Sequence, residues 1–277
     1  MTSFRSLRKV TLFSFIITLG VMLTFCNEPE KKVLVKTPYG NMKIKLYDDT
    51  PQHKENFLKL VEEGFYDDLL FHRVIEGFMI QGGDPESKGA EKGERLGSGG
   101  PGYKIPAEIN FPKRFHKKGA LAAARQGDQA NPEKESSGSQ FYIVQGQTFT
   151  FGQLDTLEMQ MTQRALQSRM FEKITPYQDT LMAMRQQGDR EGFEALISEL
   201  EEEAKAELGD SAKFEFPEEI REAYTTVGGT PMLDDNYTVF GEVEEGLNVI
   251  DSIAAVATDQ TDRPLEDIEM TMEVIEE

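Results

Sequence analysis

Apolar and polar residues alternate along much of the chain, and this pattern predicts short β-strands separated by turns. Residues 33–37 and 41–47 alternate around Pro38-Tyr39-Gly40, which is typical of a hairpin with one buried face. Strand patterns return at residues 71–75, 78–81, 119–125, 140–145, 238–243 and 267–275. Residues 51–63 and 247–253 instead carry apolar side chains at helical spacing. We therefore predict a mainly β fold, a closed antiparallel barrel capped by helices.

The pattern changes between residues 148 and 229, where strand signals are absent. Two helices are indicated by apolar residues at helical spacing, first at Leu157, Met161, Leu166 and Met170, then at Phe193, Leu196, Ile197 and Leu200. A further helix begins near Phe216-Pro217. We interpret residues 149–230 as an α-helical insertion before the penultimate strand, which divides the β domain into residues 33–148 and 231–277.

The first 26 residues have the pattern of an export signal. Three basic residues at positions 5, 8 and 9 precede an uncharged, mostly apolar run from Val10 to Phe25. The run ends at Cys26, which resembles the lipidated cysteine of bacterial lipoproteins, although Phe25 is larger than that pattern prefers. An uncleaved membrane anchor and plain secretion are the alternatives. We expect residues 27–32 to be a tether and the protein to lie in the cell envelope, membrane-anchored on the periplasmic side.

Composition narrows the possible partners and chemistry. Acidic residues outnumber basic ones by 49 to 30, which gives a net charge of −19 and argues against a nucleic-acid partner. The single cysteine excludes an internal disulfide. Residues 97–102 spell G-x-G-x-x-G, but no strand precedes them and Pro101 interrupts the turn, so we reject a dinucleotide site. We expect residues 86–112 to form a surface loop, and His116 to be solvated.

The segment FHRVIEGFMIQGGDP, residues 71–85, contains the candidate chemistry. It predicts two short strands around a bend at Glu76-Gly77. That bend brings the guanidinium of Arg73, the apolar side chains of Phe78 and Met79 and the amide of Gln81 to one patch. Gly82-Gly83 leaves the backbone bare beside this patch, as a groove for an extended peptide requires.

This segment resembles the signature of the cyclophilins, the cyclophilin-type peptidyl-prolyl cis–trans isomerases. Residues 119–125 and 136–143, then Leu233-Asp234 with 237–243, resemble further blocks of the family in the same order. The resemblance covers residues 33–148 and 231–275 and implies the family's barrel fold and activity. His72 within the signature is expected to be a buried structural histidine.

The resemblance also implies roles for individual residues. Phe78, Met79, Tyr142 and Leu233 would form a pocket for the proline ring. Arg73 would contact the substrate carbonyl and reach toward the imide nitrogen, and Gln81 would orient Arg73. The residue before proline would be bound by Gln140 and by the backbone near Ala124 and Arg125.

Three positions depart from the family pattern. The pocket aromatic is Tyr142, which adds a hydroxyl. Met232 stands where eukaryotic members often have tryptophan, so inhibitors that contact that indole should bind weakly. Tyr237 stands where many members have histidine, which leaves a flat ring without a titratable imidazole. Met232 and Tyr237 remain candidate substrate contacts.

Rotation about an X–Pro bond makes and breaks no covalent bond, so we expect neither a cofactor nor a metal. The first hypothesis is an isomerase that binds proline-containing peptides and assists the folding of exported proteins. The alternative is a non-catalytic proline-peptide chaperone or holdase that works through the helical insertion, and a structural lipoprotein is a third. Arg73 favours the enzyme, because a pure binder has no need of it. We expect the insertion to lie beside the groove.

Overall fold

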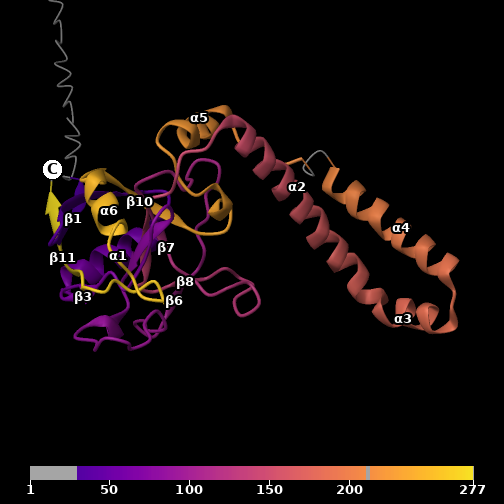
Figure 1. Cartoon of the computed structure of the whole chain (residues 1–277), viewed down its shortest axis with the longest axis horizontal. Coiled ribbons are helices and arrows are strands. Elements are labelled where there is room, and N and C mark those ends of the chain that lie inside the picture. The colour runs from indigo at the N-terminus through magenta and orange to yellow at the C-terminus, as the bar shows by residue number, and fades with distance from the viewer. Residues whose placement is uncertain (1–29, 210–212, 277) are drawn as a thin grey trace, which may run out of the picture.

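The computed structural model of the protein describes residues 30–209 and 213–276. Cys26 and the predicted export signal lie outside these residues. Within them, no helix has both the length and the apolar run that a membrane span requires. Figure 1 shows a rounded body of strands and helices from which a long helical hairpin projects.

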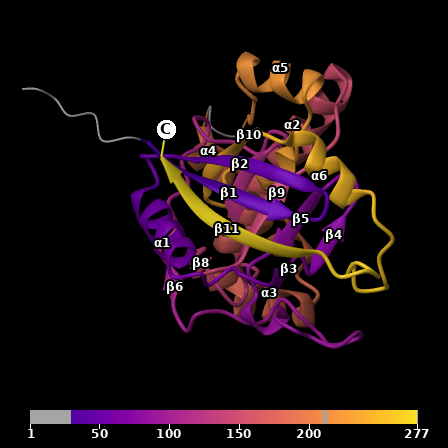
Figure 2. The same ribbon diagram turned by 90° about the vertical axis from the view of Figure 1, so that its left-hand side faces the viewer.

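A nine-stranded sheet, in which every paired strand is antiparallel, forms the body. Figure 2 shows β11, β1 and β2 side by side across its front. The strands, in spatial order, are β3 (Leu69–Leu70), β11 (Glu269–Glu276), β1 (Lys31–Thr37), β2 (Gly40–Leu46), β10 (Val239–Glu245), β7 (Ala120–Ala123), β9 (Phe141–Val144), β5 (Met79–Gly82) and β4 (Arg73–Ile75). A separate pair consists of β6 (Lys104–Ile105) and β8 (Ser136–Ser137).

The predicted barrel fold is confirmed, with one difference at its seam. The edge strands of the curled sheet, β3 and β4, do not pair with each other. Only Phe71 and His72 separate these strands along the chain. The gap between β3 and β4 is therefore spanned by two residues of the chain, and the barrel is not fully closed by strand pairing.

Alternation along the strands fills the barrel. Val33 and Val35 of β1 and Met42 and Ile44 of β2 have no exposed surface and lie in one apolar core. Two helices cap this core, α1 (Pro51–Glu62) and α6 (Leu247–Ala254). Their inward faces contribute Phe57, Leu60, Val61, Val249, Ile250 and Ile253 to it. The apolar spacing that predicts these helices is thus the spacing that buries them.

The start of α1 is stabilised by a residue far away in the sequence. The Thr50 hydroxyl donates to the Tyr47 carbonyl, so its side chain does not cap the helix. The carboxylate of Glu108 accepts hydrogen bonds instead, from the backbone N–H groups of Gln52 at 3.1 Å and His53 at 3.0 Å. A negative group at this end also interacts favourably with the helix dipole.

The predicted insertion is helical. It contains α2 (Phe151–Ile174), the 3₁₀ turn η2 (Thr175–Tyr177), α3 (Gln178–Gln187), α4 (Arg190–Leu208) and α5 (Glu218–Thr226). In Figure 1 the hairpin of α2, α3 and α4 points away from the barrel, whereas α5 returns to it. Leu154, Phe216, Ile220 and Tyr224 form a small core of their own at the base of the insertion.

The two ends of the insertion meet in a tight neck. Gly229 forms isolated β-bridges with Gln147 and with Lys117. A Cβ atom at Gly146 would lie 2.4 Å from the Gly229 Cα, and one at Gly229 would lie 2.2 Å from the carbonyl oxygen of His116. No side chain fits at this approach, so the neck requires glycine at both positions.

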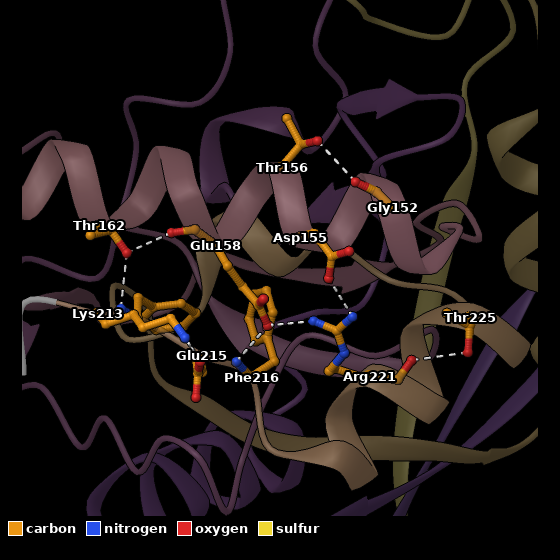
Figure 3. A network of polar contacts seen from close by, with 11 residues as sticks. Gly152, Asp155, Thr156, Glu158, Thr162, Lys213, Glu215, Phe216, Arg221 and Thr225 are labelled. Atoms are coloured by element: carbon orange, nitrogen blue, oxygen red, sulfur yellow. Dashed lines mark hydrogen bonds and ion pairs between the residues drawn. The ribbon is translucent and has the colours of Figure 1, made fainter.

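Polar contacts at the base hold α5 against α2 (Figure 3). Arg221 of α5 donates to Glu158 at 2.7 Å and to Asp155 at 2.6 Å, both on α2. Glu158 also accepts from the backbone N–H of Phe216 at 2.9 Å. Arg221 and Glu158 are largely buried, so this pair is less screened than the exposed pairs along the hairpin.

Two buried histidines of the barrel resist protonation. Burial lowers the pKa of His72 to about 4, and it also lowers the pKa of His53. A histidine in an unfolded chain titrates near pH ~6.5. Between these values the unfolded chain binds a proton at His72 that the folded chain does not, so acidification favours unfolding.

We therefore expect the free energy of unfolding to fall as the pH drops from about 7 to about 4, with His72 contributing roughly 3 kcal/mol. Urea unfolding at a series of pH values measures this slope. His72→Leu should reduce the slope and leave the part contributed by His53 and by the carboxyl groups of Asp49 and Glu108, whose pKa values are lowered in the folded protein. An unchanged slope in that variant would show that His72 does not resist protonation in the folded protein.

Candidate active site

Strand pairing places the candidate residues in one row on the outer face of the sheet. Arg73 of β4 is opposite Gln81 of β5, and Gln81 is opposite Tyr142 of β9. Tyr142 is in turn opposite Ala122 of β7. Directly opposed residues in antiparallel strands share a face, so residues separated by tens of positions in the sequence become neighbours.

The intervening residues point the other way. Val74, Ile80 and Ile143 lie in the barrel core. Met79 and Tyr142 belong to a second apolar cluster, against which partly buried side chains pack, among them Phe78, Leu233 and Tyr237. The alternation thus builds a packed interior and an apolar outer patch from the same short strands.

A cavity of about 190 Å³ opens over this patch. It is lined by Arg73, Phe78, Met79, Gln81, Ala124, Arg125, Tyr142, Leu233 and Tyr237. A larger cavity of about 620 Å³ shares Gln81, Ala124 and Arg125 with it and extends under the loop of residues 97–104. Gln140 lines this second cavity. The two together form a groove with an apolar end and a polar end.

Hydrogen bonds fix the polar side chains at the rim. Arg73 Nη1 donates to Gln81 Oε1 at 3.4 Å, and Gln81 Nε2 donates to Gln140 Oε1 at 3.1 Å. Gln140 Nε2 donates to the carbonyl oxygen of Gly99 at 2.7 Å. The series orients the Gln81 amide so that its oxygen faces the guanidinium. The glycine-rich loop therefore supports the groove and is part of it.

Asp262 gives Arg73 a second contact. Its Oδ2 lies 3.4 Å from Arg73 Nε, and its carbonyl oxygen accepts from the backbone N–H of Val74 at 2.8 Å. Asp262 has a positive φ of 64°, in a turn ahead of β11. Because 41% of the Arg73 side chain is exposed, the guanidinium remains accessible at the cavity.

Arg125 supports the wall of the cavity. Its guanidinium lies 4.5 Å from the centre of the Tyr237 ring, and its Nε donates to the Asn236 carbonyl at 2.8 Å. The Tyr237 ring meets the Tyr142 ring edge-on at 5.9 Å. The Tyr237 position thus supplies an aromatic wall, held from behind by a cation–π contact.

The position of His116, below the floor of the cavity, shows that one prediction was wrong. His116 is completely buried, contrary to the expectation that it is solvated. Its ring stacks on Tyr142 at 6.0 Å, and its Nε2 lies 3.0 Å from the Tyr142 hydroxyl. Its Nδ1 lies 2.8 Å from Oδ1 of Asp234, a partner 118 residues later. The local sequence carries no sign of this burial, because the covering residues come from the far side of the insertion.

Burial raises the pKa of the Tyr142 hydroxyl well above its usual value. The group therefore stays a neutral phenol at physiological pH, able to donate a hydrogen bond. Burial has the same effect on the pKa of Tyr224, followed by the neighbouring charge of Asp234. Neither tyrosine can supply an anion near neutral pH.

The structure brings the predicted residues together with one exception. Met232, in the 3₁₀ turn η4 (Pro231–Leu233), is 52% exposed and lines neither cavity, so its role as a substrate contact stays a prediction. Likewise, none of the insertion residues that the structure describes, 149–209 and 213–230, lines either cavity. The base of the insertion reaches the site indirectly, through the Tyr224 hydroxyl, which donates to Asp234 at 2.6 Å.

The arrangement can hold a small apolar ring beside a fixed cation. Aromatic and aliphatic side chains surround the smaller cavity, and the guanidinium and the Gln81 amide stand at its rim. Within residues 30–209 and 213–276 no group of His, Cys, Asp and Glu residues could hold a metal ion. The described site therefore offers binding, orientation and positive charge.

Comparisons with known proteins identify the family. The sequence pattern of the family described as cyclophilin type peptidyl-prolyl cis-trans isomerase/CLD matches residues 32–192 and 221–274. A Staphylococcus saprophyticus protein whose name assigns it to the peptidyl-prolyl cis-trans isomerases is 31% identical over 256 residues, which cover 91% of this chain and 96% of the relative. The chain therefore belongs to the cyclophilin-type peptidyl-prolyl cis–trans isomerases, enzymes that act on X–Pro peptide bonds.

Two further matches agree. A Staphylococcus aureus relative with the same kind of name is 30% identical over 240 residues, which cover 86% of this chain and 88% of the relative. A cyclophilin-type isomerase of Cryptosporidium parvum superposes with a TM-score of 0.50 at 20% identity, over 89% of this chain and 98% of that chain, which supports the fold. The staphylococcal matches cover more of this chain than its two barrel segments contain, so they extend into the insertion.

The exposed pair between Arg73 and Asp262 predicts a loss of activity without a change in stability. Asp262→Asn keeps a residue that tolerates the positive φ but removes the charge next to the guanidinium. We expect kcat/KM on a short proline peptide to fall roughly threefold, because a half-exposed pair is worth less than about 1 kcal/mol.

The melting temperature should stay unchanged. Glu273→Gln is the matched control, because it removes a similarly exposed partner of Lys36 in a pair that lines neither cavity. Equal activities of Asp262→Asn and wild type would exclude a role for Asp262 in orienting Arg73.

Proposed function

We propose that this chain catalyses X–Pro isomerisation in the cavity described above, with Arg73 as the catalytic cation and Gln81 as the residue that orients it. The observation that carries the proposal is the Arg73 guanidinium at the rim of the apolar cavity, contacted by Gln81 on one side and Asp262 on the other. Phe78, Met79, Tyr142 and Leu233 would surround the proline ring. Substrate residues before the proline would extend toward Ala124, Arg125 and Gln140.

The chemistry follows from what happens to the amide when it twists. A planar X–Pro amide is charge-separated by resonance, and rotation localises the lone pair on the nitrogen. The twisted state is the less polar one, so an apolar cavity favours it. A guanidinium hydrogen bond to the localised lone pair is made only in the transition state, which is the condition for raising kcat.

Removal of the Arg73 side chain is the direct test. Arg73→Ala should lower kcat/KM on an Ala-Pro peptide on the order of 30-fold or more, which corresponds to about 2 kcal/mol of barrier lowering. A protease-coupled assay measures the rate. Arg169→Ala is the matched control, because Arg169 has a similar exposure, 40% against 41%, and also forms an exposed ion pair.

The stability of Arg73→Ala should match wild type, since its ion pair is exposed. A variant that isomerises the peptide at the wild-type rate would remove Arg73 from the mechanism. A wild-type protein that does not accelerate isomerisation would instead favour the non-catalytic binder as the role of this pocket.

We further propose that the enzyme acts on proteins exported across the membrane and is tethered to the envelope through Cys26. The support is the sequence alone: the basic start, the apolar run and the cysteine that ends it. An unfolded exported chain presents its proline bonds to the solvent, where a tethered isomerase reaches them before folding buries them.

Lipidation of Cys26 should be detectable directly. Growth with an alkyne fatty acid should label the wild-type protein and place it in the membrane fraction. Cys26→Ser should lose both the label and the membrane association if the cysteine is lipidated. If the wild type carries no label and Cys26→Ser still associates with the membrane, the uncleaved anchor is indicated instead. If the wild type and Cys26→Ser are both released into the medium, secretion is indicated.

A further inference from the structure

A buried carboxylate links the insertion to the floor of the pocket. Asp234 has no exposed surface, and its carboxylate accepts three hydrogen bonds. The backbone N–H of His116 donates at 2.9 Å and the His116 ring at 2.8 Å, both to Oδ1. The hydroxyl of Tyr224, on α5 of the insertion, donates to Oδ2 at 2.6 Å. A buried carboxylate needs such donors, so the groups around it hold one another in place.

The direction of the hydrogen bonds continues this link to the substrate pocket. A carboxylate only accepts, so the His116 proton toward Asp234 is on Nδ1. In the neutral ring Nε2 then accepts from the Tyr142 hydroxyl at 3.0 Å. Tyr142 lines the smaller cavity through its ring, while its hydroxyl points to His116.

We infer that the insertion positions the proline pocket: Tyr224 of α5 holds Asp234, Asp234 holds His116, and His116 holds the Tyr142 ring at the pocket floor. Tyr224, Asp234 and His116 are positioning residues and touch no substrate. The inference rests on the proposed function, because it takes the smaller cavity as the site where the proline ring binds.

Tyr224 is placed by the insertion together with Phe115, a residue ahead of the insertion whose ring lies 5.6 Å from the Tyr224 ring. Its ring contacts Phe216 of the insertion at 5.7 Å and Phe149 at 6.3 Å. Helix α5 is clamped to α2 through Arg221 (Figure 3), and the neck at Gly229 fixes where the chain leaves the insertion. A change in the base of the insertion therefore shifts the Tyr224 hydroxyl, and with it the donors around Asp234.

Asp234 also fixes a second wall of the same pocket. It directly follows Leu233 and lies three residues before Tyr237, and both of these residues line the cavity. The carbonyl oxygen of His116 accepts from the backbone N–H of Thr230 at 2.9 Å, at the start of this segment. Floor and wall thus share one anchor, so a loose Asp234 would widen the pocket from two sides.

Tyr224→Phe tests the inference with the least disturbance. It keeps the ring and its aromatic contacts and removes only the hydroxyl that donates to Asp234. We expect KM for an Ala-Pro peptide to rise roughly three- to tenfold, because only part of the cost of losing one hydrogen bond to a charged group reaches the pocket, while kcat changes little. A loose pocket weakens binding of the ground state and the transition state alike, whereas the Arg73 cation acts on kcat.

A matched control and a double-mutant cycle make the test specific. Tyr177→Phe removes the hydroxyl of an exposed tyrosine elsewhere in the insertion and should leave both constants unchanged. In a Tyr142→Phe background the effect of Tyr224→Phe should shrink, because the last hydrogen bond of the series is already gone. Such non-additivity is the signature of residues that act through one another.

Two outcomes would overturn the inference: an unchanged KM in Tyr224→Phe, or effects of Tyr224→Phe and Tyr142→Phe that simply add. Failure of the proposed function looks different. In that case Arg73→Ala would keep its activity, whatever Tyr224→Phe does. If Tyr224→Phe has the wild-type kcat and KM while Arg73→Ala is inactive, only the link between the insertion and the pocket is rejected.

Discussion

The alternation of side chains across β4, β5 and β9 is the constraint on which the rest of this structure depends. One set of positions, with Val74, Ile80 and Ile143, fills the barrel and stabilises the sheet. The other set, with Arg73, Gln81 and Tyr142, is turned outward in a single row. The strands that stabilise the fold therefore also hold the cation and the pocket floor in register, and a slip of one residue would lose both.

Around that row, polar contacts turn an apolar patch into a defined site. The glycine-rich loop reaches Gln81 through Gln140, and the turn at Asp262 reaches Arg73 from the other side. Behind the floor, Asp234 gathers donors from the barrel and from the insertion. The cavity that we propose for the proline ring is thus assembled from barrel strands and surface loops, and helix α5, which contributes no lining residue, reaches it through Asp234.

The sequence predicts much of this arrangement, but it does not predict burial or side-chain contacts that depend on residues far apart in the chain. Strand and helix positions follow from local periodicity, and the placement of Phe78, Met79 and Tyr142 follows from the family resemblance. The burial of His116 and the contact of Asp262 with Arg73 could not be foreseen, because each partner arrives from a distant part of the chain. The capping of α1 by Glu108, which lies more than fifty residues away, could not be foreseen for the same reason.

The central claim is that a proline ring enters the smaller cavity and that its amide rotates there. Two-dimensional exchange NMR of an Ala-Pro peptide with a catalytic amount of enzyme, together with methyl shifts of Met79, measures both events in one sample. The account predicts cis–trans exchange cross-peaks and a Met79 shift that saturates with the peptide. Exchange without any shift at Met79, or a saturating shift without exchange, would contradict it.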